Sequence, residues 1–468
     1  MSFAINNAVV IGSGVMGAGI AAHMANNGLK VLLLDILPFE FSADDQAQGW
    51  TQSSPEWRNK LSDNALKDLL KARRPVFTSE ESFKRIKTGN LTDDLGLISE
   101  YDWVLETIIE KLEIKIPLFK QIEQLRRKDS IITTNTSGIP IKHITSESSF
   151  EFKQYFMGTH FFNPPTYVKL LEIIPGVETL PEVVEFMRVF MRDRLNKSVL
   201  ICKDTPNFVA NRMAVAVSLN ALHLADRMGM RVEEVDALCG HAMARLRNPV
   251  FGTSDAVGLD TNFNVVTNLF KNTPDDERRQ MFKYPSYAEK LLQKGWLGNK
   301  AGQGYYKTVI EADGTKKELV LDLATIEYRD RVEPDFPCLK AAEALDNPAE
   351  KLKALLSDRK NDRGSSFAWE VVTSDFIYAA NRVLEICDTL MDIDNAMKWG
   401  YFWRLGPFEA WDSLGVRETV NQMKEEGKTV PARIDKMLAN GCESFYKKAD
   451  GVNCYYDFRT ESYQPIPE

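Results

Sequence analysis

A strand, a tight glycine turn, a helix and a second strand are predicted over residues 7–35, and this unit constrains the rest of the chain most strongly. Residues 8–11 form a short apolar run rich in β-branched side chains, and three glycines follow in the G-x-G-x-x-G spacing, at Gly12, Gly14 and Gly17. The first glycine permits the sharp turn, the second lets backbone approach a pyrophosphate, and the third lets the helix pack close to the strand. The pyrophosphate would lie at the helix N-terminus, beside Val15 and Met16, because unpaired N–H groups and the helix dipole attract anions there.

A carboxylate at the end of the second strand indicates which dinucleotide binds. Residues 31–34 are apolar and Asp35 follows them, where folds of this type place the partner of the adenosine ribose hydroxyls. That carboxylate would repel a 2′-phosphate, and Ile36 and Leu37 after it supply no cation. We therefore expect an α/β domain of the Rossmann type that binds NAD rather than NADP. The strand, helix and acid together distinguish this motif from a glycine-rich turn without a function.

Length and composition bound the remaining possibilities. A chain of 468 residues exceeds what one hydrophobic core usually organises, so more than one domain is expected. The 58 basic and 66 acidic residues give a net charge of −8, which argues against a general nucleic-acid-binding protein. Six cysteines are scattered without a C-x-x-C pair, so we expect a reducing compartment and no structural metal. No apolar run approaches the roughly 20 residues that span a bilayer, and the first strand starts too early for a signal peptide, so a cytoplasmic protein is expected.

A long polar segment, residues 37–94, follows the first unit and is not needed by a minimal dinucleotide-binding fold. Basic side chains are concentrated in it at helical spacing, Lys67 and Lys71 among them. Two interpretations are open. Charge alone favours a solvated helix face, and the alternative is a basic arm that meets a phosphorylated substrate.

Polar residues follow two further predicted strands. Residues 103–106 form one strand, with Glu110 opening the helix after it, and residues 130–137 form another that ends at Ser137. Ligands of an open parallel sheet lie beyond the carboxyl ends of its strands, so both side chains are placed to reach one. Each could instead cap a helix or a turn, and capping is the default for Ser137 alone.

A histidine and a glutamate are predicted to face each other across a hairpin. Residues 157–165 include His160 and end in two prolines that enforce a turn, and a strand containing Glu172 resumes over residues 168–174. In a hairpin centred near Thr166, antiparallel register pairs His160 with Glu172. The carboxylate would fix the histidine tautomer and stabilise the imidazolium, which makes an oriented general base. A histidine beside aromatic residues is more often part of a core, but the paired acid and the cofactor motif favour catalysis.

The second half of the chain is predicted to be helical, with an internal echo. Asn211-Arg212 and Asn381-Arg382 are each followed by a cluster of Gly, Pro, Phe, Asp and Leu. These clusters start at Asn248 and Leu405. We expect an NAD-binding domain over residues 1–201 with a helical insertion at about 37–94, a first all-helical domain over 202–308, a charged linker over 309–366, and a second all-helical domain over 367–468.

The chain resembles the 3-hydroxyacyl-CoA dehydrogenases. The shared motifs, which extend from Asn7 to about Tyr306, are GSGVMGAGIAAHMANNG, ETIIEKLEIK, NTSGIPI, GTHFFNPPTYVKLLEIIPG, CKDTPNFVANR and LGNKAGQGYY. A weaker resemblance, from about Trp369 to Gly415, is to the second helical domain of larger multifunctional members. The resemblance implies a Rossmann domain followed by two all-α domains of the family's C-terminal type.

The resemblance also implies roles for individual residues. His160 would be the general base, held by Glu172, and Ser137 and Asn211 would contact the substrate oxygen or the histidine. Within the cofactor set, Glu110, Asn163 and Lys300 would line the nicotinamide half, and Lys115 would lie near the CoA and cofactor phosphates. The polar segment matches a helical arm that reaches toward CoA, which favours Lys67 and Lys71 as substrate contacts. The full set implied for NAD is Gly12, Gly14, Val15, Met16, Gly17, Asp35, Glu110, Lys115, Asn163 and Lys300.

The function implied is NAD-dependent oxidation of L-3-hydroxyacyl-CoA to 3-oxoacyl-CoA in fatty-acid β-oxidation, with an enoyl-CoA hydratase domain or a thiolase as partner. One alternative keeps the fold and the His160/Glu172 pair but uses a free hydroxy acid or sugar acid. Another is a catalytically idle NAD-binding structural or interaction protein, since fold alone does not prove activity. The four groups of His160, Glu172, Ser137 and Asn211 favour an enzyme. Two helical domains could mimic a dimer within one chain, so the oligomeric state stays open.

Overall fold

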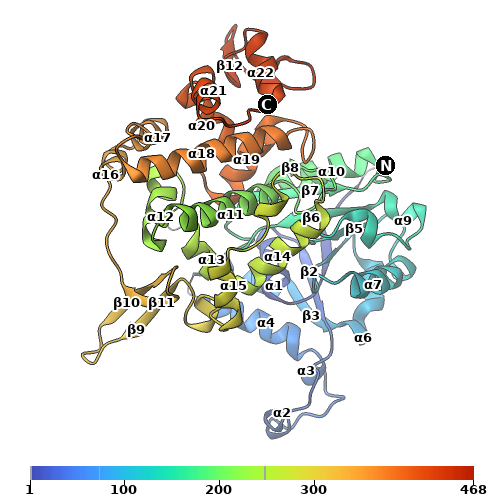
Figure 1. Cartoon of the computed structure of the whole chain (residues 1–468). Coiled ribbons are helices and arrows are strands. Elements are labelled where there is room, and N and C mark those ends of the chain that lie inside the picture. The colour runs from blue at the N-terminus through green and yellow to red at the C-terminus, as the bar shows by residue number, and fades with distance from the viewer. Residues whose placement is uncertain (1–2, 73, 247–248, 468) are drawn as a thin grey trace. The chain divides into compact units, whose positions relative to one another are not determined.

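The computed structural model describes residues 3–72, 74–246 and 249–467, and it divides into two compact units, one ending at Phe208 and one starting at Val209. The first unit is an α/β domain and the second is mainly helical (Figure 1). The predicted fold class, a Rossmann-type domain followed by helical domains, is confirmed.

An eight-stranded sheet forms the centre of the first unit, in the order β3, β2, β1, β4, β5, β6, β7, β8. Neighbouring strands are parallel from β3 to β6 and between β7 and β8, whereas β6 and β7 are antiparallel. The central strands are buried apolar runs, as expected where helices cover both faces of a parallel sheet. The strands are β1 (Asn7–Ile11), β2 (Lys30–Asp35), β3 (Ile86–Asn90), β4 (Trp103–Glu106), β5 (Ile131–Thr134), β6 (Phe156–Phe161), β7 (Leu170–Pro175) and β8 (Ser198–Ile201).

Helices connect these strands. Helix α10 is amphipathic and buries Val183, Met187 and Met191 at helical spacing, whereas α1 is buried continuously from Gly17 to Ala25. The helices of this unit are α1 (Val15–Asn26), α2 (Ala43–Ala47), α3 (Pro55–Arg58), α4 (Lys60–Leu70), α5 (Glu80–Lys84), α6 (Leu91–Asp94), the 3₁₀ helix η1 (Leu95–Glu100), α7 (Leu112–Leu125), α8 (Ile141–Ile144), α9 (Phe150–Gln154) and α10 (Pro181–Asp193).

The polar segment over residues 37–94, predicted to be a helical insertion, contains a strand of the sheet as well as helices. It contains α2 to α6, and α2 lies at the tip of the segment, away from the sheet (Figure 1). It also contains β3, which pairs with β2 and forms the edge of the sheet. Sequence analysis missed β3. Its five residues, IKTGN, include a single large apolar side chain, Ile86, so they show no alternating pattern that would predict a strand. On α4, Ser62 and Leu66 are buried and Lys67 is exposed, whereas Lys60 is half-buried and pairs with the buried Asp45.

The second unit contains helices and two small sheets. Its first helical region comprises α11 (Ala210–Met228), α12 (Val232–Cys239), η2 (His241–Met243), α13 (Phe251–Val257), α14 (Leu259–Asn272), η3 (Arg279–Met281), α15 (Ser286–Gln293) and η4 (Asn299–Ala301), followed by β9 (Tyr306–Ile310), β10 (Lys316–Asp322) and β11 (Glu327–Asp330). Its second comprises α16 (Pro337–Glu343), α17 (Pro348–Leu355), α18 (Arg363–Arg382), α19 (Leu390–Tyr401), α20 (Pro407–Leu414), α21 (Val416–Glu425) and α22 (Ala432–Ala439), followed by β12 (Tyr446–Ala449), β13 (Val452–Asp457) and β14 (Ser462–Pro465). Each sheet has three antiparallel strands, which the prediction of all-helical domains did not include.

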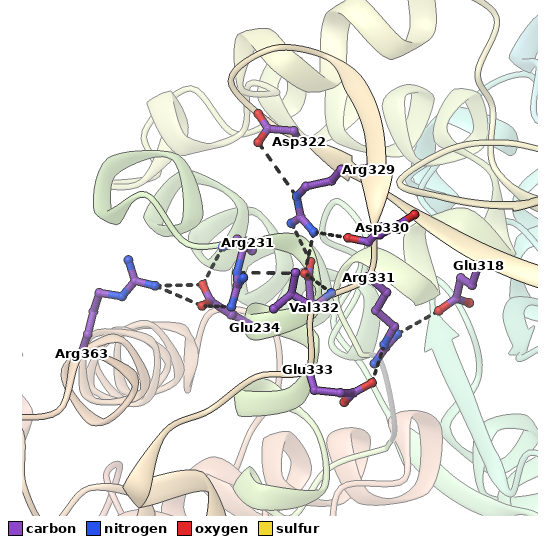
Figure 2. A network of polar contacts seen from close by, with 11 residues as sticks. Arg231, Glu234, Glu318, Asp322, Arg329, Asp330, Arg331, Val332, Glu333 and Arg363 are labelled. Atoms are coloured by element: carbon purple, nitrogen blue, oxygen red, sulfur yellow. Dashed lines mark hydrogen bonds and ion pairs between the residues drawn. The ribbon is translucent and has the colours of Figure 1, made fainter.

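Residues 309–366 are an ordered part of this unit, so the prediction of a linker is wrong. They contain β10, β11, α16 and α17, and their charged side chains form ion pairs (Figure 2). Arg329 of β11 donates two hydrogen bonds to Glu233 of α12, at 2.7 and 2.9 Å, and Arg363 of α18 donates to Glu234. Burial opposes ionisation of Glu233, but the hydrogen bonds and charge of Arg329 together with backbone N–H donors outweigh it, so the pKa of Glu233 lies below its usual value.

Two buried aspartates make the same contacts in the two helical regions. Asp236 accepts backbone N–H groups at the start of α13 and the hydroxyl of Tyr306. Asp394 accepts backbone N–H groups at the start of α20 and the hydroxyl of Tyr446. Burial raises the pKa of Asp236 to about 6 and the pKa of Asp394 to about 8. This repeated arrangement supports the prediction of two related helical regions.

The Asn-Arg part of the predicted echo is wrong. Asn211-Arg212 lies in the first turn of α11, whereas Asn381-Arg382 ends α18, so the two pairs occupy opposite ends of their helices. Helix α18 extends back to Arg363, through residues that sequence analysis assigned to the linker. Asn248, where the first cluster was placed, lies outside the described residues.

Replacement of Arg329 by Ala should destabilise the second unit. The change would leave the buried Glu233 carboxylate without its bidentate partner, and we expect a loss of about 3 kcal/mol in the free energy of unfolding at pH 7, measured with urea. Because the pKa of Glu233 is lower in the folded state than in the unfolded state, the stabilisation by the Arg329–Glu233 pair is fully present above the pKa of Glu233 in the unfolded chain. It should disappear as the pH falls through the folded pKa.

Arg331→Ala is the matched control. Arg331 pairs with Glu318 and Glu333, whose carboxylates are largely exposed, so its removal should cost less than about 1 kcal/mol. Equal losses for the two variants would contradict a structural role for the Arg329–Glu233 pair.

Candidate active site

The glycine turn between β1 and α1 has the geometry that a pyrophosphate requires. Gly12 has a φ of +99°, and a Cβ there would lie 2.9 Å from the Thr107 carbonyl oxygen. A Cβ at Gly17 would lie 1.8 Å from the Gly12 carbonyl oxygen, so the helix can approach the strand only without a side chain. A Cβ at Gly14 would meet no atom within 4 Å, which leaves open space at the start of α1. No side chain caps this helix among the described residues, and its N–H groups can meet a phosphate.

The carboxylate of Asp35 is held beside the same turn. Its Oδ2 accepts hydrogen bonds from the Ser13 N–H, at 2.7 Å, and from the Ser13 hydroxyl, and its Oδ1 accepts from the Ile36 N–H. The acid therefore lies at the end of β2 next to the first turn of α1, which fits the predicted contact with ribose hydroxyls. Sequence analysis missed Ser13, and its position between the first two glycines was the only signal for it. Val15, which opens α1, is 74% exposed, and Met16 packs partly against the core.

A buried ion-pair network connects the ends of β4 and β5. Glu106 ends β4 and Lys115 lies on α7, and their side chains are 0% and 1% exposed with 2.7 Å between Nζ and Oε1. Lys115 also lies 3.3 Å from Glu110, whose Oε1 accepts hydrogen bonds from the Thr136 hydroxyl and the Ser137 N–H. Burial raises the pKa of Glu106, and the contact with Lys115 opposes that shift. The structure thus brings Glu110 and Ser137 together at the carboxyl edge of the sheet.

Lys115, which the resemblance implies near the CoA and cofactor phosphates, is buried. Its ammonium group lies inside the domain between Glu106 and Glu110, and its side chain is 1% exposed. The structure thus places it beside Glu110, and a contact with the phosphates stays a prediction. Glu106 was absent from the sequence-based prediction because a glutamate at a strand end carries no sign of a buried partner nine residues away.

His160 and Glu172 face each other on β6 and β7, so the predicted register is confirmed. The Nδ1 atom of His160 lies 2.7 Å from Oε2 of Glu172, and the two residues are 5% and 0% exposed. Because a carboxylate accepts hydrogen bonds, Nδ1 carries the proton, and Nε2 is the nitrogen that can take a proton from a ligand. The rings of Phe162 and Phe208 lie 4.4 and 5.8 Å from the imidazole, between centroids, and form an apolar wall.

The turn after β6 connects this pair to the nucleotide-binding helix. Asn163 is exposed two residues beyond the end of the strand. Pro165, two residues later, packs against Gly19 of α1, where a Cβ would lie 3.1 Å from the proline Cδ. Asn163 is therefore carried by a turn that rests on α1.

The remaining predicted site residues belong to other elements. Asn211, on α11, and Lys300, on η4, belong to the second unit, where Tyr401 donates a hydrogen bond to Asn211 and Lys300 pairs with Asp260. Lys67 and Lys71 are exposed at the C-terminal end of α4 in the first unit, and Lys71 pairs with Asp68 on the surface.

The open glycine turn and the acid at the end of β2 define an NAD-binding domain of the Rossmann type, and a histidine–glutamate pair lies near the carboxyl end of β6. The family described as "3-hydroxyacyl-CoA dehydrogenase, NAD binding domain" matches residues 7–205, and "3-hydroxyacyl-CoA dehydrogenase, C-terminal domain" matches residues 208–308. The chain belongs to the 3-hydroxyacyl-CoA dehydrogenase family.

Named relatives agree with this membership. A probable 3-hydroxyacyl-CoA dehydrogenase of Bacillus subtilis is 41% identical over 453 residues, which are 97% of this chain and 56% of the relative. A probable 3-hydroxyacyl-CoA dehydrogenase of Deinococcus radiodurans is 40% identical over 303 residues, 65% of this chain and 83% of the relative. The crystal structure of 3-hydroxybutyryl-CoA dehydrogenase from Escherichia coli has a TM-score of 0.68 at 23% identity, covers 94% of this chain and all of that chain, and supports the fold. The chain thus spans little more than half the length of the Bacillus relative.

Two glycine variants should separate cofactor binding from folding. Gly14→Ala should leave the stability of the protein nearly unchanged, because its Cβ meets no protein atom, but should weaken NAD binding by filling the space for the pyrophosphate. Gly17→Ala should lower both stability and NAD affinity, because its Cβ collides with the Gly12 carbonyl and the Thr107 hydroxyl. Calorimetric titration with NADH and urea unfolding measure the two quantities. Undiminished NADH affinity in Gly14→Ala would contradict the assignment of this turn.

Proposed function

We propose that the protein oxidises L-3-hydroxyacyl-CoA to 3-oxoacyl-CoA with NAD. The observation that carries the proposal is the buried His160/Glu172 pair near the carboxyl end of β6, together with the open turn at Gly14. Oxidation of a secondary alcohol requires a base for the hydroxyl proton and an acceptor for the hydride. The pair supplies an oriented base, and the turn with Asp35 suits the cofactor.

The reaction divides between the cofactor and the residues of this chain. When bound, NAD⁺ supplies the acceptor for the hydride that leaves C3 of the substrate. His160 takes the hydroxyl proton on Nε2, and the C3 oxygen becomes a carbonyl as the C–H and O–H bonds break. Glu172 holds Nδ1 and stabilises the imidazolium that results. The reverse reaction uses the imidazolium as the acid.

The other site residues are assigned to binding. Ser137 and Asn211 would contact the substrate oxygen or the histidine, and Glu110, held by Lys115, would line the nicotinamide half with Asn163 and Lys300. Lys67 and Lys71 are exposed on the arm that the family directs toward CoA, and they are proposed as contacts for its phosphates. In this account Lys115 acts through Glu110.

Two other functions make different demands on the substrate. A dehydrogenase of a free hydroxy acid or sugar acid would use the same base without a preference for CoA thioesters. A catalytically idle NAD-binding protein would oxidise neither CoA thioesters nor free hydroxy acids. The buried pair of His160 and Glu172 favours an enzyme over an idle scaffold. Burial of a carboxylate costs free energy, and an imidazole without a catalytic role gives no reason for that cost.

The proposed biological setting is fatty-acid β-oxidation in the cytoplasm, with an enoyl-CoA hydratase or a thiolase as functional partner. The partner reactions follow from the chemistry, since a hydratase forms the 3-hydroxyacyl thioester and a thiolase cleaves the 3-oxoacyl thioester. Across the described residues, no helix is both long and apolar enough to cross a membrane. The oligomeric state is proposed to be monomeric, with the two helical regions taking the place of a dimer, and a stable dimer in solution would contradict this.

Substrate turnover tests the proposed function. NADH absorbance should rise when the protein and NAD⁺ are mixed with L-3-hydroxybutyryl-CoA or with a long-chain L-3-hydroxyacyl-CoA, but not with free 3-hydroxybutyrate. His160→Ala should lower the rate by about 10²- to 10⁴-fold while NADH binding stays unchanged, because the base is lost and the glycine turn is intact. Turnover of the free acid alone would support the hydroxy-acid alternative. Tight NADH binding without turnover of any substrate would support the idle protein.

A further inference from the structure

The first turn of α11 is held by residues from the second helical region. Oδ1 of Asn211 accepts a hydrogen bond from the hydroxyl of Tyr401, the last residue of α19, at 2.7 Å. The next residue, Arg212, donates from Nε to the hydroxyl of Tyr378 on α18, at 2.6 Å. These partners lie 190 and 166 residues further along the chain. Both are outside residues 208–308, which match the family's C-terminal domain.

The end of α19 is fixed by contacts that do not involve Asn211. The guanidinium of Arg245 stacks on the ring of Trp403, 3.6 Å from its centroid. The backbone N–H of Arg404 donates to the carbonyl oxygen of Ala244, at 2.9 Å. These contacts anchor the chain directly after Tyr401, so the backbone that carries its ring is held by contacts other than the one with Asn211.

The hydrogen bond determines which side of the Asn211 amide can act on a ligand. An asparagine amide has an acceptor oxygen and a donor nitrogen on opposite sides. Because the oxygen accepts from Tyr401, the Nδ2 donor is directed to the other side. An N–H donor aimed at a substrate oxygen stabilises the negative charge that develops there as the proton leaves.

We infer that Tyr401 is a positioning residue for the proposed reaction, which holds Asn211 so that Nδ2 donates to the substrate oxygen. The inference rests on the proposed function, in which Asn211 contacts the substrate oxygen or the histidine, and it selects the first of these contacts. It also gives the second helical region a part in catalysis. Without the hydroxyl of Tyr401, the amide of Asn211 can rotate and the donor is no longer fixed.

Tyr401→Phe and Asn211→Asp test the inference with L-3-hydroxybutyryl-CoA. Tyr401→Phe should lower kcat about fivefold with little change in KM, since it removes one hydrogen bond from an intact ring. Asn211→Asp keeps an oxygen acceptor for Tyr401 but has no N–H donor, and it should lower kcat about 100-fold. The double variant should be no slower than Asn211→Asp alone, because Tyr401 acts only through the amide donor.

Tyr446→Phe is the matched control. It removes a tyrosine hydroxyl that donates to the buried Asp394 at 2.8 Å in the same helical region, and it should change kcat by less than about twofold, since that bond serves the fold. A fall in kcat for Tyr401→Phe no larger than that for Tyr446→Phe would overturn the inference. Multiplying effects of Tyr401→Phe and Asn211→Asp in the double variant would also overturn it.

A measurement without turnover separates this inference from the proposed function. If the wild-type protein oxidises no CoA ester, the proposed function fails, and the amide geometry is read from NMR spectra of protein labelled with ¹⁵N-asparagine. The side-chain NH₂ signals of Asn211, assigned by their loss in Asn211→Asp, should shift in Tyr401→Phe and stay in place in Tyr446→Phe. Unchanged Asn211 signals in Tyr401→Phe would show that the hydroxyl does not hold the amide.

Discussion

The antiparallel pairing of β6 with β7 places a carboxylate and an imidazole side by side in the interior. Glu172 is fully buried, and an ionised carboxylate in that position requires hydrogen-bond donors, because its transfer from water without them is strongly unfavourable. Nδ1 of His160 is one such donor, at 2.7 Å. The same bond leaves Nε2 as the basic nitrogen. The hydrogen bond that stabilises the buried carboxylate of Glu172 therefore also orients the imidazole of His160 as a base. Stability and chemistry depend on this one interaction.

Buried carboxylates organise other parts of the molecule in two different ways. Glu106 is stabilised by the ammonium of Lys115, and that network extends through Glu110 to the backbone of Ser137 at the edge of the sheet. Asp236 and Asp394 are instead stabilised by backbone N–H groups and a tyrosine hydroxyl. Burial raises the pKa of all three carboxyl groups. The charge of Lys115 opposes that shift at Glu106, and hydrogen bonds oppose it at Asp236 and Asp394.

Features encoded within a few residues could be predicted from the sequence. The glycine spacing identified the turn, and the two prolines after His160 fixed the hairpin register with Glu172. Position at strand ends predicted that Glu110 and Ser137 would lie at one edge. Each of these rests on local backbone geometry, where periodicity and turn residues determine which side chains share a face.

Contacts between distant segments could not be predicted. The charged run over residues 309–366 looked like a linker because its partners, such as Glu233, lie about a hundred residues earlier. Strand β3 is too short and polar to be recognised without β2 beside it. The hydrogen bond between Tyr401 and Asn211 leaves no local pattern, and the burial of Lys115 depends on the end of β4. A charged residue in sequence shows its chemistry but not whether its charge is already paired.

The account depends most on the claim that Glu172 acts through His160, and a double-mutant cycle tests it directly. The quantity to measure is kcat/KM for NAD⁺-dependent oxidation of L-3-hydroxybutyryl-CoA by the wild type, His160→Gln, Glu172→Gln and the double variant, with NADH affinity as the control for folding. The account predicts that both single variants are slower and that the double variant is no slower than His160→Gln, because the carboxylate has no role without the imidazole. Losses that multiply in the double variant, with NADH affinity unchanged, would show that Glu172 acts independently and would contradict the oriented-base account.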